Sequence, residues 1–221
     1  MSTPEYPNLK ELSIIQKEAL KKLGQIGADQ AAQALTGFLE QSIFMKATSF
    51  EIAKIELIPS LLQNKFPSDT QIAIFSASNT KEIAYTVLIL FDKEIVTKIL
   101  SQKSPESNDI EAVMEFSTLF MDVLKEVGSI ILIKYIITLN NFMNLESMLP
   151  SQPLLRIGKL DSLAKNELID FKKGLHVLIL GCDIHLKEEF YFNYLKTDII
   201  LIPHQESYLD FFNTIFQEHN Q

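Results

Sequence analysis

The chain has a single cysteine, few basic residues and no long uninterrupted apolar run, and each shortage excludes a class of protein. Cys182 cannot form an internal disulfide, and its apolar neighbours predict a small buried side chain. The 20 lysines and arginines are scattered and the net charge is −8, so a nucleic-acid partner is not expected. Apolar runs such as residues 129–139 are interrupted by Lys134. They are far shorter than the roughly 18–20 residues that a membrane span needs, so we expect a soluble protein.

The length and the N-terminus set further bounds. With 221 residues and 47% hydrophobic content, the chain can bury one substantial core or two small fused ones. Residues 1–7 have neither a basic start nor a following apolar core, so no secretory signal is expected. The expected location is therefore the cytoplasm.

A helical stretch occurs twice in the sequence. Residues 18–26 recur as residues 122–130, an offset of 104 positions. Five identities carry the repeat: Leu20, Lys21, Gly24, Ile26 and Leu35 recur as Leu124, Lys125, Gly128, Ile130 and Leu139. A repeat of this length predicts two related halves that face one another.

Hydrophobic periodicity predicts the same order of elements in both halves. In the first half we expect two helical segments within residues 8–39, strands at 50–58, 71–77 and 83–91, and a helix at 92–101. In the second half we expect helices at 110–143, 160–171 and 207–218, and strands at 154–157, 175–184, 190–195 and 198–202. The polar stretch 101–109 is the expected junction between the halves.

These elements predict an α/β (α+β) fold in a single domain, 1–221, with repeats at about 8–101 and 108–218. Neither half has enough strands to protect a sheet of its own, so two pseudo-symmetric units of helices and three strands should share one sheet packed by helices. At the same offset, residues 71–75 are expected to superpose on residues 175–179.

The repeated helix carries different polar residues in its two copies. Asp122, Glu126 and Ser129 lie at positions i, i+4 and i+7, so they share one helix face that we expect to be exposed. A solvated surface is the plain interpretation, but like charges one turn apart do not stabilise a helix. The first copy has Glu18, Lys22 and Gln25 instead, and Glu18 precedes Lys22 in the order that favours a structural ion pair.

The two helical copies, the strands that follow them, and the ending at Pro203 with an amphipathic helix resemble the CheC, CheX and FliY phosphatases of bacterial chemotaxis. The similarity spans essentially the whole chain. In that family each active helix carries Asp or Ser, then three residues, Glu, two residues and Asn, with a proline some twenty residues later. The matching positions here are residues 122, 126 and 129 in the second copy and residues 18, 22 and 25 in the first.

The resemblance implies dephosphorylation of a CheY-like response regulator in two-component signalling. Water attacks the regulator's phosphoaspartate in line, near a Mg²⁺ that the regulator itself supplies, so no cofactor or metal is implied on this chain. The helix glutamate engages the regulator's lysine and the asparagine orients the water. This assignment is chemically reasonable because phosphoryl transfer depends on positioning and charge stabilisation.

Neither copy keeps the whole family pattern. The second helix keeps Asp122 and Glu126 but has Ser129 for the asparagine, and a serine lacks the amide's fixed geometry. In the first helix Lys22 replaces the glutamate and should repel a regulator lysine, although Gln25 keeps an amide. The family proline is also displaced. Thr48 stands at the proline position in the first half, and Pro150 and Pro153 bracket that position in the second half.

Three functions therefore remain open. The first is phosphatase activity through the second helix, and the second is a non-catalytic module that binds a receiver domain or a chemotaxis or flagellar-switch partner. The third is a paralogue that mainly dimerises. The resemblance also leaves open a CheD-like deamidase partner and a homodimer.

Overall fold

The structure is a computed structural model that describes residues 12–65, 71–79, 82–92, 118–146, 150–160, 174–187 and 192–217. The helices are α1 (Ile14–Leu39), α2 (Ile58–Lys65), α5 (Thr118–Phe142) and α7 (Tyr208–Gln217). The strands are β1 (Ile43–Lys54), β2 (Gln71–Asn79), β3 (Tyr85–Asp92), β4 (Leu154–Lys159), β5 (His176–Lys187) and β6 (Phe192–Pro203). Short 3₁₀ turns, η1 (Ile55–Leu57) and η2 (Gln205–Ser207), precede α2 and α7.

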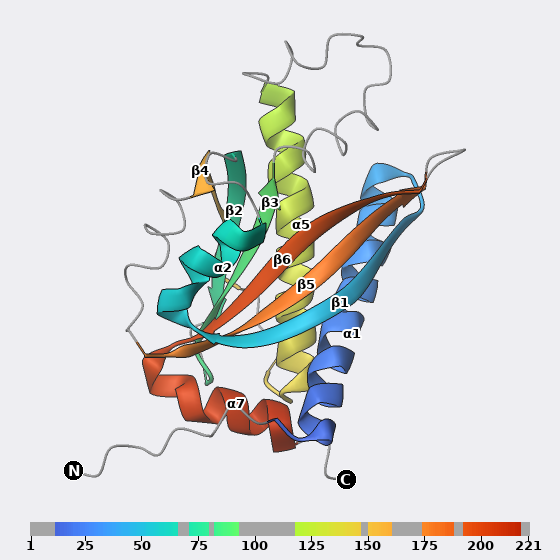
Figure 1. The fold of residues 1–221 in the computed structure, drawn as a ribbon. Coiled ribbons are helices and arrows are strands. Elements are labelled where there is room, and N and C mark those ends of the chain that lie inside the picture. The colour runs from blue at the N-terminus through green and yellow to red at the C-terminus, as the bar shows by residue number, and fades with distance from the viewer. Residues whose placement is uncertain are drawn as a thin grey trace, which may run out of the picture.

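The six strands form one antiparallel sheet between two layers of helix (Figure 1). The long helices α1 and α5 lie side by side behind the sheet and run in opposite directions, while α2 packs on the front (Figure 1). Burial follows this layering, with a large core between the sheet and the long helices and a smaller one beneath α2. The mixed α+β class predicted from the sequence is confirmed.

The sheet has internal twofold symmetry. Its strand order is β1-β5-β6-β3-β2-β4. Exchanging each strand of the first half for its counterpart, β1 for β4, β2 for β5 and β3 for β6, gives the same order read backwards. The pseudo-twofold axis therefore passes between β3 and β6, the two central strands, and each half supplies three strands to one sheet, as the repeat predicts.

Burial along the two long helices repeats at the predicted offset. The buried positions of α1 are residues 19, 20, 23, 24, 27, 28, 31, 32, 35 and 39, and each counterpart 104 positions later is also buried. The side chains differ in size: Gly27, Ala28 and Ala31 of α1 correspond to Ile131, Leu132 and Tyr135 of α5. Because α1 supplies small residues where α5 supplies large ones, the helices can approach closely without a void.

Three helix glycines permit the closest contacts. A methyl group added at Gly27 would lie 2.5 Å from the ring of Tyr135, whose hydroxyl donates a 3.2 Å hydrogen bond to the Gly24 carbonyl. On the other side of the axis, a methyl group at Gly128 would overlap the ring of Phe75 in β2. A methyl group at Gly24 would lie 3.2 Å from Ala47 Cβ in β1 and 3.8 Å from the Leu180 side chain in β5. The glycines therefore bring both helices down onto the sheet and onto each other.

The same contacts correct the expected strand alignment. Gly24 and Gly128 are equivalent, so their neighbours Leu180 and Phe75 are equivalent too, which places the strands at an offset of 105. The sequence alignment instead matched Phe75 with Ile179, which lies on the opposite face in the core beneath α2. That expectation was wrong by one residue, and in a strand a one-residue slip exchanges the two faces.

Other boundaries also differ from expectation. The two helical segments expected within 8–39 form one helix from residue 14, because Gly24 and Gly27 are packed rather than turning the chain. The strand expected at 50–58 lies at 43–54. Residues 55–58 of the expected strand belong instead to η1 and to the first residue of α2, a helix that the sequence did not predict. The strands expected at 190–195 and 198–202 are one strand, β6. Helices were expected at 92–101, 160–171 and 110–143. Residues 93–101 of the first, 161–171 of the second and 110–117 of the third fall outside the described residues.

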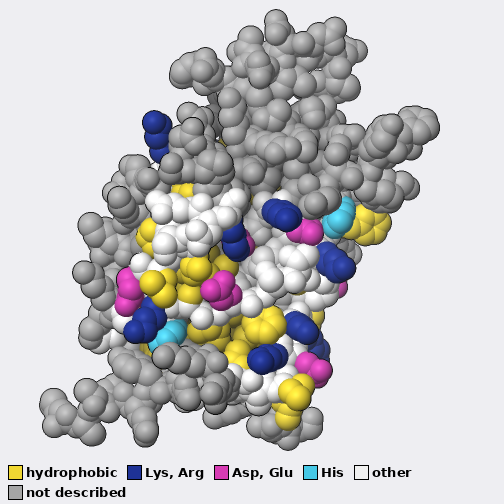
Figure 2. Space-filling model, in the orientation of Figure 1, with side chains coloured by type: hydrophobic (Ala, Val, Ile, Leu, Met, Phe, Trp, Pro, Cys, Tyr) yellow, Lys and Arg dark blue, Asp and Glu magenta, His cyan; other side chains and the backbone are white. Residues whose placement is uncertain are grey.

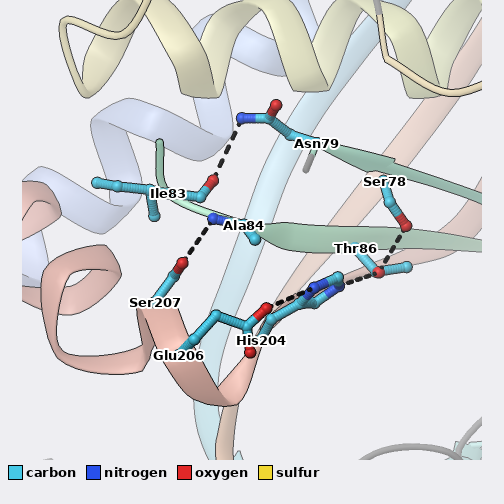
Figure 3. A network of polar contacts seen from close by, with 8 residues as sticks. All are labelled: Ser78, Asn79, Ile83, Ala84, Thr86, His204, Glu206 and Ser207. Atoms are coloured by element: carbon cyan, nitrogen blue, oxygen red, sulfur yellow. Dashed lines mark hydrogen bonds and ion pairs between the residues drawn. The ribbon is translucent and has the colours of Figure 1, made fainter. Parts of the chain in front are cut away.

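A polar network fixes the beginning of β3 to the turn that follows β6 (Figure 3). The Ala84 amide donates to Ser207 Oγ at 2.8 Å, and the His204 amide donates to the Ala84 carbonyl at 2.9 Å. Thr86 Oγ1 and His204 Nε2 share a further hydrogen bond of 2.9 Å. Because these contacts satisfy backbone groups next to a buried strand end, they hold η2, and with it α7, in place.

The helix contact can be tested with two glycine-to-alanine substitutions in α1. Gly27→Ala should lower the free energy of unfolding by about 1–3 kcal/mol, because the new methyl group meets the buried Tyr135 ring. Gly37→Ala should raise it by about 0.5–1 kcal/mol, because nothing lies within 4 Å and alanine favours the helix. Urea denaturation of both variants measures the two effects, and shifts of the same sign would contradict the close contact.

Candidate functional site

The acidic stripe of α5, which we define as Asp122, Glu126 and Ser129, lies on the helix side turned away from the core. Asp122 and Glu126 are exposed and Ser129 is half-buried. Within the described part of the chain, neither carboxylate forms an ion pair and the Ser129 hydroxyl has no hydrogen-bond partner. These three side chains are therefore available to a ligand or partner.

The equivalent positions of α1 are arranged differently. Glu18 and Lys22 are exposed, but the expected ion pair between them does not form among the described residues. Gln25 is half-buried, and its Oε1 accepts a 3.1 Å hydrogen bond from the Ala47 amide of β1. Its Nε2 donates to Asp29 Oδ1 at 2.8 Å. The first-copy amide is thus occupied by the protein itself.

The hydrogen bonds of Gln25 satisfy the free edge of the sheet. Among the described strands, β1 pairs only with β5, so its outer backbone groups have no strand partner within that part of the chain. Gln25 bonds to Ala47 and, at 3.4 Å, to the Met45 carbonyl, while Thr36 Oγ1 accepts from the Ile43 amide at 3.0 Å. Side chains of α1 therefore cover the edge as a neighbouring strand would, which also protects it from pairing with another chain. This role could not be predicted from sequence patterns, because it depends on α1 lying beside β1.

The positions of the displaced family proline also have a structural role. Thr48 lies at a bulge in β1, where the pairing with β5 shifts by one residue between Ala47 and Ser49. Gly181 lies opposite, and any side chain there would overlap Ser49. In the second half, the loop that carries Pro150 and Pro153 precedes β4, and Ser151 in this loop forms hydrogen bonds to the backbone of β2.

Two clefts open on opposite sides of the molecule. A groove of about 450 Å³ between α1 and α5 is lined by Lys22, Ile26, Gln30, Lys134, Ile137, Thr138, Asn141 and Phe142. A cleft of about 340 Å³ lies on the α2 side, beside the 2.7 Å ion pair of Lys65 with the buried Asp198. On that side, charges of both signs are interspersed with apolar side chains (Figure 2).

The described residues hold neither a metal-binding cluster nor a membrane-spanning helix. They contain no group of three or more histidine, cysteine or acidic side chains arranged to hold a metal ion. No helix among them is both long and apolar enough to cross a bilayer.

Comparison with solved structures shows which proteins share this fold. FliY from Thermotoga maritima matches with a TM-score of 0.70 and 15% identity, covering 95% of this chain and 99% of that chain. The FliM middle domain from Vibrio alginolyticus matches with a TM-score of 0.58 and 12% identity, covering 89% and 99%. A chain of the FliG–FliM complex from H. pylori matches with a TM-score of 0.58 and 11% identity, covering 90% and 100%.

No protein-family profile matches the sequence. The structural comparison nevertheless shows that the protein shares its fold with FliY and with the FliM middle domain, and FliY belongs to the group that the sequence resembles. Sequence identities of 11–15% establish a shared fold alone.

Cys182 is a buried residue of the core, as the sequence predicts. Burial raises the pKa of its thiol to about 12, so the thiolate is not formed at neutral pH. The thiol of the native protein should therefore not react with a disulfide reagent such as DTNB at pH 8, and it should react fully in denaturing urea. Rapid stoichiometric reaction of the native protein would show that the side chain is accessible.

The different roles of Gln25 and Ser129 can be tested by stability. Gln25→Ala should lower the free energy of unfolding by about 1–2 kcal/mol, because the Ala47 amide loses its partner. Ser129→Ala should change it by less than about 0.5 kcal/mol, because no described contact is lost. Urea denaturation measures both variants, and hydrogen exchange at the Ala47 amide should accelerate only in Gln25→Ala. Equal effects would show that the two positions have the same role.

Proposed function

We propose that the protein binds the phosphorylated receiver domain of a CheY-like response regulator through the acidic stripe of α5 and promotes hydrolysis of its phosphoaspartate. The observation that carries this proposal is the contrast between the equivalent positions of the two helices. On α5, Glu126 is exposed and Ser129 is without a described partner, whereas α1 has Lys22 and a Gln25 that is bound to the sheet edge.

The chemistry asks little of the side chains beyond placement. Glu126 can pair with the lysine ammonium of the receiver, which fixes α5 beside the phosphoryl group. The Ser129 hydroxyl can accept a hydrogen bond from a water molecule and hold it for in-line attack. The new bond joins the water oxygen to phosphorus, the bond to the aspartate oxygen breaks, and inorganic phosphate and a free carboxylate result. The Mg²⁺ in this reaction belongs to the receiver.

Position matters more than basicity here, so the length of residue 129 should set the rate. Ser129 is shorter than the asparagine of the family pattern, and its hydroxyl can rotate, whereas an amide has a fixed geometry. A displacement of about 1 Å can cost about a hundredfold in rate. We therefore expect weak phosphatase activity from the natural sequence.

A second candidate is a non-catalytic module that binds a receiver domain or a flagellar-switch partner. It is favoured by the likeness to FliM middle domains, one of which was solved in a FliG–FliM complex, and by the serine at position 129. A CheD-like deamidase and a second copy of this chain remain further partners to test.

The substitution Ser129→Asn distinguishes the two candidates. It should accelerate phosphate release, because it adds an amide beside an available Glu126, while the affinity for the receiver should hardly change. The measurement is phosphate release from a CheY-type receiver domain phosphorylated with acetyl phosphate in Mg²⁺, with catalytic amounts of the protein. The affinity is measured with the same receiver activated by beryllofluoride.

Glu126→Ala and Glu18→Ala form a matched pair, because each removes one exposed carboxylate from a long helix. Wild-type acceleration that is lost only in Glu126→Ala supports the phosphatase. Acceleration seen only in Ser129→Asn supports a binding module that has lost its chemistry. If neither the natural protein nor Ser129→Asn accelerates release while both bind, the protein is not a phosphatase. Absence of binding in every variant would refute the assignment of the receiver.

A further inference from the structure

The groove between α1 and α5 has a regular construction that the proposed function does not use. One wall is Lys22, Ile26 and Gln30 of α1, which lie at positions i, i+4 and i+8 and so form a single row (α1 wall). The other wall begins at Lys134 of α5 and continues to Phe142. Eight residues of helix span about 12 Å, so the groove is long enough for about two turns of another helix.

The groove combines an apolar floor with positive charge. Ile26 is 36% exposed, and Ile137 and Phe142 are half-buried, so apolar surface lies open to solvent. Lys22 and Lys134 stand on opposite walls, and none of the described residues that line the groove is acidic. The basic lining is a local feature, because the whole chain carries a net charge of −8.

The internal symmetry supplies a built-in comparison. The residues of α5 equivalent to the α1 wall are Glu126, Ile130 and Lys134. The other end of the helix pair therefore has an acidic side chain where the groove has Lys22. The isoleucine in the middle of the row is kept in both copies. The two copies of this helix row thus keep the isoleucine and carry opposite charge at one position.

We propose that this groove, residues 22–30 of α1 with residues 134–142 of α5, is a docking site for an acidic amphipathic helix of a partner protein. Apolar residues of the partner at i, i+3, i+4 and i+7 would cover Ile26, Ile137 and Phe142, and its flanking carboxylates would face Lys22 and Lys134. The charge complementarity selects an acidic partner over a basic one. The site is separate from the acidic stripe, so it stands or falls independently of the phosphatase proposal.

The test uses the full chain and a synthetic helical peptide of about 14 residues, with leucine or phenylalanine at the i, i+3, i+4 and i+7 positions and glutamate elsewhere. A peptide with lysine in place of every glutamate is the charge control. Fluorescence anisotropy should show binding of the acidic peptide and at least about tenfold weaker binding of the basic one. Lys22→Glu and Lys134→Glu should each weaken binding of the acidic peptide by at least about fivefold.

Lys125→Glu is the matched control, because Lys125 is an exposed lysine of α5 outside the groove and the charge change is the same. It should leave the affinity within about twofold. Ile26→Ser, which removes exposed apolar surface from the α1 wall, should weaken binding at both low and high salt. Equal effects of Lys22→Glu and Lys125→Glu, or equal binding of both peptides, would overturn the proposal.

Two more measurements separate the alternatives. Glu126→Ala should leave peptide binding unchanged even if it abolishes phosphate release, so failure of one proposal does not imply failure of the other. Sedimentation of the natural protein and of Lys22→Glu identifies the other occupant. A dimer of the natural protein that Lys22→Glu dissociates would show that a second copy fills the groove, which would overturn the assignment to a partner helix.

Discussion

The close packing of α1 against α5 sets the geometry on which the other features depend. Gly27 accepts the Tyr135 ring, and the Tyr135 hydroxyl reaches the Gly24 carbonyl, so the two helices meet without an intervening layer of large side chains. Gly128 and Phe75 make the corresponding contact with the sheet. This spacing places the acidic stripe at one end of the helix pair and the basic groove at the other.

The two halves share a scaffold and differ at the surface. Core positions repeat along the helices and the strand order is its own mirror image under exchange of the halves. The polar residues do not repeat: Glu126 faces solvent where the first half has Lys22, and Ser129 is without a described partner where Gln25 bonds to β1. Such divergence leaves the fold unchanged, because exposed substitutions cost little stability. It gives each end of one helix pair its own charge and its own chemistry.

The sequence predicts the parts of the fold that follow from local pattern. The repeat of Leu20 and Gly24 as Leu124 and Gly128 predicted two equivalent helices, and the strand patterns of the two halves predicted one shared sheet; the likeness to FliY confirms the fold. Features set by tertiary contacts were not predictable. Glycines that usually weaken a helix remain inside α1 because the Tyr135 ring fills the space beside them. The strand alignment was wrong by one residue because apolar side chains on both faces of a buried strand give no alternation to fix the register. The exposure of Asp122 and Glu126 agrees with expectation, whereas the role of Gln25 required the position of the β1 edge.

The bond from Gln25 to the edge of β1 constrains how such a protein can evolve. If α5 carries the proposed phosphatase site, a lineage that needed an equivalent site on α1 would have to release that amide, and the released strand edge would then be open to pairing with another chain. The gain in chemistry would therefore carry an aggregation risk unless a compensating change arrived first, either a new side chain covering Ala47 or a partner strand. Substitutions on α5 carry no such risk at Ser129. Mutational paths toward higher activity should accordingly be short on one helix and conditional on prior changes on the other, even though both helices descend from the same repeat.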